Sequence, residues 1–408
     1  MLTASSNWIS CQIGAREHYT IPRAIQKQGK LAHLITDAWV YSQSSLNLLP
    51  KNLLANLRER YHPDLLPASV HAFSRSLISF EFTQRIQNKT GWELVIARNQ
   101  WFQQQAIKTL TSLVDQFTTP PILFSYSYAA LELFKFAKQQ GWYTILGQID
   151  PGILEEAIVI KEYEQYPQYR AEWQPAPPKY WQTWREECAL ADRIVVNSNW
   201  SCQLVGKTGV DPNKIHVIPL VYTPPKAATN FVRTYPKLFS QDRPLRVLFL
   251  GQVILRKGIA ALLSAVEHLE GYPIEFWIVG SQQITIPPHL QMHPQIRWVG
   301  HVNRSETAQY YQLADIFLFP TLSDGFGLTQ LEAQAWKLPL IASRCCGEVV
   351  VDGVNGWILD EVSGEAIVNL IQSILRNPEQ LTYFSNHSVK PSQFNLSTLS
   401  QSLQTLIP

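Results

Sequence analysis

Short apolar runs alternate with segments of helical periodicity along most of this 408-residue chain. Runs such as residues 122–127 and 193–198 are bounded by proline, glycine or polar residues, and they predict buried strands. Segments such as residues 129–140 and 259–269 carry apolar residues at helical spacing and predict helices. Because strands and helices alternate in both halves, we expect an α/β fold with two doubly wound parallel sheets.

The same pattern divides the chain into domains. Residues 1–223 predict a first Rossmann-like domain, and residues 244–385 predict a second one. Residues 224–243 contain prolines and no strong period, so we expect a linker there. Residues 386–408 predict a C-terminal helix that packs back on the first domain. Two such sheets, facing each other across a cleft, would bring the carboxyl ends of their strands face to face.

Two stretches of the first half fit the alternation poorly. Residues 41–95 are polar and rich in Leu and Asn, and their elements are not clear from the pattern. Residues 155–190 are rich in Glu, Tyr, Pro and Trp, and they predict an exposed, partly helical excursion.

A strand, a glycine turn and a helix follow one another between residues 314 and 343. The turn Ser323–Gly327 contains two glycines, which permit positive φ and the close approach of a ligand to the backbone. The helix that follows would direct free backbone N–H groups and the positive end of its dipole beyond the strand. Asp324 and Glu332 could then hold the hydroxyls of a polyol, while the amides hold phosphate. An ordinary turn with a solvated Asp324 and a surface Glu332 fits the spacing equally well.

Composition excludes several classes of protein. Apolar residues make up 46% of the chain and charged residues 16%, which is typical of a globular protein. A net charge of +2 without a block of Lys and Arg argues against a nucleic-acid partner. No run of 18 apolar residues predicts a membrane span, and Met1–Cys11 lacks the pattern of a secretory signal.

The five cysteines have no metal-ligand spacing. An odd number in a chain of this length favours reduced thiols and a cytoplasmic protein, and a vicinal redox pair at Cys345 and Cys346 is the alternative. The sequence also lacks a dinucleotide fingerprint, a phosphate loop, a zinc-type histidine pair and a nucleophile elbow.

Four local patterns occur in order in the second half: FLGQVILRKG at 249–258, WIVG at 277–280 with WVGH at 298–301, the stretch 317–343, and residues 347–357. Taken together, they resemble the retaining nucleotide-sugar glycosyltransferases of the "group one" family, which have the GT-B fold. The first half resembles the family more faintly, at residues 14–28 and 195–219.

The resemblance implies roles for individual residues. Lys257 and Arg256 would neutralise the donor diphosphate, Glu332 would accept from ribose hydroxyls, and Asp324 would hold sugar hydroxyls near the reacting centre. Gly14 would let a first-domain loop approach the diphosphate. The implied donor-binding residues are Gly14, Gly251, Gln252, Arg256, Lys257, Gly280, Val299, Asp324, Gly325, Phe326, Gly327, Leu328, Thr329 and Glu332. The implied catalytic residues are Asp324, Lys257, Arg256 and Asp150.

The chain departs from the family's pattern at three positions. Asp324 stands where Glu is usual, Gln252 stands where Arg is usual, and Gln148-Ile149-Asp150 stands where the family has a histidine near the acceptor. Arg256 can supply the cation that Gln252 lacks. Asp150 follows a first-domain strand at its carboxyl end, so we expect it on the acceptor side.

The resemblance implies a retaining enzyme that moves a hexosyl unit from a nucleoside-diphosphate sugar to a hydroxyl of a glycan, a lipid-linked glycan or a small molecule. No metal or other cofactor is expected, because cationic side chains and helix dipoles would replace it. Epimerases and disaccharide phosphorylases share the fold and remain alternatives, as does a catalytically silent nucleotide-sugar-binding protein. Polysaccharide biosynthesis in the cytoplasm is the expected setting, and peripheral contact with the inner face of the membrane stays open.

Overall fold

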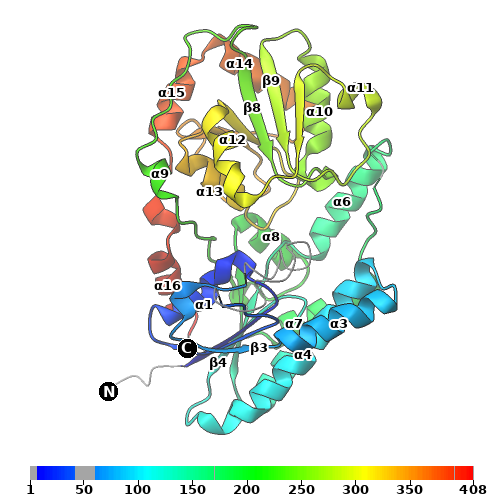
Figure 1. Cartoon of the computed structure of the whole chain (residues 1–408), viewed down its shortest axis with the longest axis vertical. Helices are drawn as coiled ribbons and strands as arrows, with labels where there is room; N and C mark the ends of the chain where they lie inside the picture. Colours follow the sequence, from blue (N-terminus) through cyan, green and yellow to red (C-terminus); the bar gives the residue numbers. More distant parts are fainter. Residues whose placement is uncertain (1–6, 42–59, 170, 390, 408) are drawn as a thin grey trace.

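The computed structural model describes residues 7–41, 60–169, 171–389 and 391–407. The described residues form two parallel sheets, one in each half of the chain, each with helices on both faces (Figure 1). The expected fold class, two doubly wound parallel-sheet domains, is confirmed.

The first sheet has the strand order β3-β2-β1-β4-β5-β6-β7. Its strands are β1 (Trp8–Gln12), β2 (Leu31–Thr36), β3 (Ser69–Ala72), β4 (Ile122–Tyr126), β5 (Tyr143–Gly147), β6 (Arg193–Val196) and β7 (Ile215–Val217). Its helices are α1 (Thr20–Gln26), α3 (Ser74–Ile86), α4 (Gly91–Leu113), α5 (Leu131–Gln139), α6 (Ile153–Gln165), α7 (Pro178–Leu190) and α8 (Asn199–Lys207). The order reverses between β1 and β4, where a crevice opens at the carboxyl ends of the strands.

The second sheet has the strand order β10-β9-β8-β11-β12-β13. Its strands are β8 (Leu245–Leu250), β9 (Ile274–Val279), β10 (Ile296–Gly300), β11 (Ile316–Phe319), β12 (Leu340–Ala342) and β13 (Gly356–Ile358). Its helices are α10 (Ile259–His268), α11 (Pro288–Gln291), α12 (Thr307–Leu313), α13 (Leu328–Ala335), α14 (Gly364–Arg376) and α15 (Glu379–Asn386). Here the order reverses between β8 and β11.

Burial on both faces explains why β11 is apolar throughout. All four residues of β11, Ile-Phe-Leu-Phe, are buried, and they alternate between the two apolar clusters that cover the sheet. Parallel sheets covered by helices on both sides favour such continuous apolar strands. The strongly amphipathic α14 packs its buried Ile367, Ile371 and Ile374 into one of these clusters.

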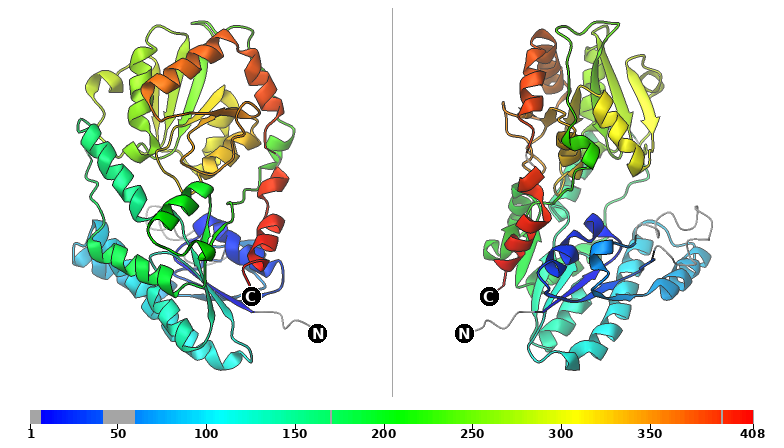
Figure 2. Two further views of the ribbon diagram at one scale, coloured as in Figure 1. Left: turned by 180° about the vertical axis from the view of Figure 1, so that it is seen from behind. Right: turned by 60° about the vertical axis from the view of Figure 1, so that its left-hand side comes forward.

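Residues 218–244 connect the two sheets and contain the short helix α9 (Lys226–Thr229). Arg233 ties this connection to the second domain, because its guanidinium donates to the carbonyl oxygens of Tyr311, Ala314 and Trp336. After the second domain, the C-terminal segment of the chain lies against the first domain (Figure 2).

The terminal helix α16 (Leu396–Gln404) lies against α1. Leu399 and Leu403 are buried in the first-domain core, and Lys27 Nζ donates to Ser397 Oγ at 2.7 Å.

The expectation of an exposed, partly helical excursion at residues 155–190 is confirmed for the helices and for the exposure of much of α6, but it is wrong for the buried face of α7. Those residues form most of α6 and α7, and the second of these helices buries Trp184, Glu187 and Cys188 in the first-domain core. The Glu-rich composition misled the prediction, because Glu187 is buried as a helix cap: its carboxylate accepts from the backbone N–H groups of Tyr128, Ala130 and Leu131 at 2.7–3.1 Å.

Candidate functional site

The loops that follow β8 and β11 meet where the strand order of the second sheet reverses. The first loop carries Lys257, the second carries Asp324, and their side chains form an ion pair. Gly258 closes the first loop in the left-handed conformation, at φ 72°. A Cβ at this position would lie 1.8 Å from the carbonyl oxygen of Pro320, so only glycine allows the two loops to approach.

The Lys257–Asp324 pair is largely sheltered from solvent, with side chains 15% and 16% exposed. Burial alone would raise the pKa of Asp324, but Lys257 and Arg256 outweigh it and hold that pKa below its ordinary value. The Lys257 ammonium also lies 5.2 Å from the centre of the Phe319 ring. Asp324 is therefore ionised at neutral pH, and the Lys257 side chain lies beside it at the carboxyl edge of the sheet.

Arg256 joins the second domain to the first. Its guanidinium donates to the carbonyl oxygen of Ser323 at 2.7 Å and lies 3.6 Å from the carboxylate of Glu155 on α6. The Ser323 hydroxyl in turn donates to Glu155 at 2.8 Å. Burial raises the pKa of Glu155 to about 7, against the opposing effect of Arg256. Asp150 and Asp324 also raise that pKa, so four acidic and basic groups from both domains act on one another here.

The turn between Asp324 and Leu328 lies against the first domain. A Cβ on Gly325 would be 2.1 Å from the carbonyl oxygen of Ile149, so the turn packs directly on the end of β5. The Phe326 ring is buried between Leu331 and Val349, and its role is packing. No side chain among the described residues caps α13, which begins after Gly327, so its first-turn amides remain available to an anion.

Glu332 lies one turn into α13 and is already held by protein groups. Its carboxylate accepts from Tyr311 Oη at 2.8 Å and lies 3.7 Å from the Arg304 guanidinium. Burial raises the pKa of Glu332 above its ordinary value, although Tyr311 and Arg304 oppose this effect. A cavity of about 370 Å³ borders Arg304 and Leu328 and is closed on its other side by first-domain residues such as His18.

Asp150 lies on the first-domain wall at the domain junction, where it lines two cavities. Its carboxylate accepts from Tyr128 Oη at 2.5 Å, from Gln148 Nε2 at 3.1 Å and from the Gly152 N–H at 2.9 Å. Tyr128 itself adopts a positive φ of 74°, and Glu187 accepts its N–H. A strained residue thus holds the carboxylate in place.

The remaining predicted residues lie on strand ends, loops and α13 of the two domains. Gly251 and Gly280 directly follow β8 and β9, and Val299 lies on β10. Gln252 is exposed, and Thr329 is half-buried on α13. Gly14 belongs to the first-domain loop after β1, where its N–H donates to Asp37 at 2.9 Å.

Sequence reasoning missed several groups at the domain junction. Trp200 Nε1 donates to Ser323 Oγ at 3.0 Å, and the Asn199 N–H donates to Glu348 at 3.0 Å. Glu155 was assigned to a solvated stretch. The only feature of the sequence that could have identified Glu155 is its position. It lies five residues after Asp150, at the start of a helix that follows the carboxyl end of a strand.

Within the described ranges, no cluster of three His, Cys, Asp or Glu side chains could hold a metal ion. No helix in the part of the chain that the structure describes is both long and apolar enough to cross a membrane.

Residues 233–390 match the family model described as glycosyl transferases group 1. A D-inositol 3-phosphate glycosyltransferase of Xylanimonas cellulosilytica is 30% identical over 198 residues, which are 42% of this chain and 46% of that protein. The capsular polysaccharide biosynthesis glycosyltransferase CapM of Staphylococcus aureus is 28% identical over 150 residues, 34% of this chain and 39% of that protein. The chain therefore matches less than half the length of these curated relatives.

The crystal structure of Anabaena HepE in complex with UDP superimposes on this structure with a TM-score of 0.60. The superposition covers 98% of both chains at 14% sequence identity, so it establishes the fold alone. With these comparisons, the expected resemblance to group 1 glycosyltransferases and the GT-B fold are both confirmed.

Proposed function

We propose that this chain, which carries a domain of the glycosyl transferases group 1 family, transfers a hexosyl unit from a nucleoside-diphosphate sugar to an acceptor hydroxyl. The observation that carries the proposal is the cationic group at the junction of β8 and β11. Lys257 and Arg256 contact Asp324 and Ser323 in the turn that leads into α13, and Glu332 lies one turn into that helix. These groups match an anionic diphosphate and the hydroxyls of a ribose.

The donor would lie along this edge of the second sheet. Its diphosphate would contact Lys257 and the first-turn amides of α13, and its ribose would reach Glu332. On binding, the phosphate would replace part of the present pairing between Lys257 and Asp324, which frees the Asp324 carboxylate to accept from sugar hydroxyls. The UDP in the complex of the Anabaena protein makes UDP the first nucleotide to test.

The proposed reaction proceeds with retained anomeric configuration. The bond between the anomeric carbon and the diphosphate oxygen breaks while the acceptor oxygen bonds to the same carbon from the same face. The acceptor proton passes to the departing phosphate oxygen, so the protein supplies neither a nucleophile nor a base. Lys257 and Arg256 stabilise the charge that develops on the diphosphate.

Transfer is tested by incubating the protein with UDP-sugars and an acceptor panel while measuring release of UDP. Release that requires an acceptor, with a product of retained configuration by proton NMR, supports the proposal. Release that requires inorganic phosphate would indicate a phosphorylase, and a changed sugar in the recovered nucleotide would indicate an epimerase. Binding without turnover across the panel would favour a silent binding protein.

Two substitutions test the donor site. Lys257→Ala and Glu332→Ala should each abolish transfer, a loss of at least about 10²-fold in kcat/KM, because each removes a preorganised group at the reacting charge or the ribose. Lys237→Ala serves as the matched control, since Lys237 is exposed and lies outside the site. Activity of either site variant at the level of the control would contradict the donor-site assignment.

A cytoplasmic role in polysaccharide biosynthesis, without a metal ion, is part of the same proposal. If no metal ion is needed, transfer activity should persist in the presence of a metal chelator.

A further inference from the structure

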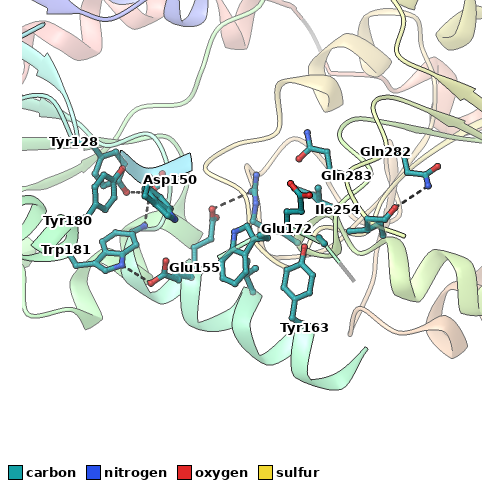
Figure 3. Close-up of a pocket in the computed structure, with 18 of the residues that line it drawn as sticks. Tyr128, Asp150, Glu155, Tyr163, Glu172, Tyr180, Trp181, Ile254, Gln282 and Gln283 are labelled. Carbon is teal, nitrogen blue, oxygen red and sulfur yellow. Dashed lines mark hydrogen bonds and ion pairs between the residues drawn. The ribbon is translucent and has the colours of Figure 1, made fainter. Parts of the chain in front are cut away.

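A cavity of about 690 Å³ lies between the two domains, and neither Lys257, Asp324 nor Glu332 lines it. Its walls come from α6, from the segment that leads into α7, and from the second-domain loops after β8 and β9 (Figure 3). Arg256 forms part of its lining, so the cavity opens directly beside the cationic group proposed to hold the diphosphate. Its size suits a small organic ligand.

Aromatic rings form two flat surfaces in this cavity. Tyr128 and Tyr180 stack at 4.8 Å with an interplanar angle of 19°, and Trp181 meets Tyr180 edge-on at 5.3 Å. On α6, Tyr163 stacks on Trp173 at 5.2 Å and 10°. Trp173 is 38% exposed, so a face of this second pair is open to a ligand. Large apolar rings with fixed geometry suit the C–H faces of a sugar ring.

The polar groups of the lining are predominantly acidic. Four acidic side chains, those of Asp150, Glu155, Glu156 and Glu172, and one guanidinium, that of Arg256, line the cavity. Arg256 contacts Glu155 and the Ser323 carbonyl oxygen, and the proposed function assigns its charge to the donor diphosphate, so the lining holds no second cation for an anionic acceptor.

Two of the other acids, Asp150 and Glu156, are held in fixed positions by protein donors. Asp150 accepts from three protein donors, and Glu156 accepts from Trp181 Nε1 at 2.7 Å and from the Ala176 N–H. Such carboxylates retain lone pairs for sugar hydroxyls, and the amides of Gln282 and Gln283 add donors from the opposite wall (Figure 3). A phosphate or carboxylate in this space would meet like charge on several sides without a free counter-charge.

We propose that this cavity receives the acceptor, and that the acceptor is a saccharide without a phosphate or carboxylate group. The inference rests on the proposed transferase function, because it names the substrate class of the same domain junction. The aromatic faces hold the ring, and the fixed carboxylates and amides orient its hydroxyls. The negative potential of the lining excludes anionic sugars.

Saturation-transfer NMR on the whole chain tests the proposal without requiring turnover. The probes are glucose, galactose and mannose, each compared with its 6-phosphate. We expect binding of at least one uncharged sugar, at least about tenfold tighter than its phosphate. Equal or tighter binding of the phosphates, or binding of none of the uncharged sugars, would overturn the proposal.

Two variants locate the binding. Trp173→Ala should weaken binding of the uncharged sugar about tenfold, because one stacking face is lost. Glu172→Lys should raise the affinity for the 6-phosphate relative to the uncharged sugar. Glu164→Lys is the matched control, with the same change of charge at an exposed position of α6 outside the lining. Unchanged binding in Trp173→Ala, or an equal response of the two Lys variants, would place the sugar elsewhere.

Failure of this inference is distinguishable from failure of the proposed function. UDP release with phosphorylated acceptors only would refute the acceptor class and leave transfer intact. Uncharged-sugar binding that depends on Trp173, without UDP release for any acceptor, would refute transfer and leave the cavity assignment intact.

Discussion

At the scale of single residues, Glu155 is the group whose environment differs most from its sequence expectation. It was expected in solvent, but it lies between Arg256 and Ser323 at the domain junction. Because burial raises its pKa from the usual 4.5 to about 7, folding favours its protonated form.

The raised pKa predicts a pH dependence of stability. Between the unfolded value of 4.5 and about pH 7, the native state binds more protons at Glu155 than the unfolded state does. The contribution of Glu155 to the free energy of unfolding is therefore largest below pH 4.5, and it is lost as the pH rises through 7. Glu155→Gln should reduce this slope, although Glu162 and Glu187, whose pKa values are also raised to about 7, keep part of it, and Glu164→Gln, at an exposed position, should leave it unchanged. Urea unfolding of the three proteins from pH 5 to 8 provides the measurement, and parallel curves for wild type and Glu155→Gln would refute the assignment.

Burial and neighbouring charges set the pKa of Asp324 as they set that of Glu155, but with the opposite result. Its burial is offset by Lys257 and Arg256, so its pKa is lowered and it stays ionised. The family resemblance implied that Lys257 and Asp324 both serve one site, but it did not imply that the two pair with each other. The Asp324 side chain is one methylene shorter than the Glu that is usual at this position. This length is compatible with the direct contact between Asp324 and Lys257.

At the scale of elements, the helix–strand alternation was sufficient to predict the fold. The runs at 122–127 and 193–198 form β4 and β6, because continuous apolar residues are stable only when both faces of a strand are covered. The same reasoning failed for α7, since a buried Glu187 that caps α5 looks like a solvated acid in the sequence. Which acid caps a distant helix depends on tertiary contacts that periodicity does not contain.

The C-terminal helix α16 offers a prediction at this scale. Leu403 is 2% exposed and packs into the first-domain core, although the whole second domain precedes it in the chain. Leu403→Ala should lower the free energy of unfolding by about 2–4 kcal/mol, because it leaves a cavity in that core. Gln401→Ala, on the exposed side of the same helix, should change it by less than about 0.5 kcal/mol. Chemical denaturation measures both, and equal stability of the two variants would mean that α16 does not contribute to this core.

At the scale of the whole molecule, the two domains contact each other through the turn that holds the candidate site. Ser201 Oγ donates to the Gly325 carbonyl oxygen at 3.3 Å, and Trp200 donates to Ser323. The sequence predicted two domains with a cleft, but not which residues join them, because contacts between separately folded units leave no periodic signal.

Gly325 tests this closed arrangement. Its Cβ position lies 2.1 Å from the backbone of Ile149, which cannot move without displacing β5. Gly325→Ala should therefore separate the domains and raise the radius of gyration measured by small-angle X-ray scattering. Gly206→Ala, in α8 with no atom nearer than 4.0 Å to the added methyl group, should leave it unchanged. The same radius of gyration in both variants would show that the turn does not hold the domains together.

The central claim is that the junction of β8 and β11 binds a nucleoside diphosphate through Lys257 and Glu332. Isothermal titration of UDP into the whole chain measures this directly. We expect binding by the wild type and by Lys237→Ala, and a loss of at least about tenfold in affinity for Lys257→Ala and for Glu332→Gln, since each contact is charge-assisted. Undiminished UDP affinity in both site variants would contradict the claim.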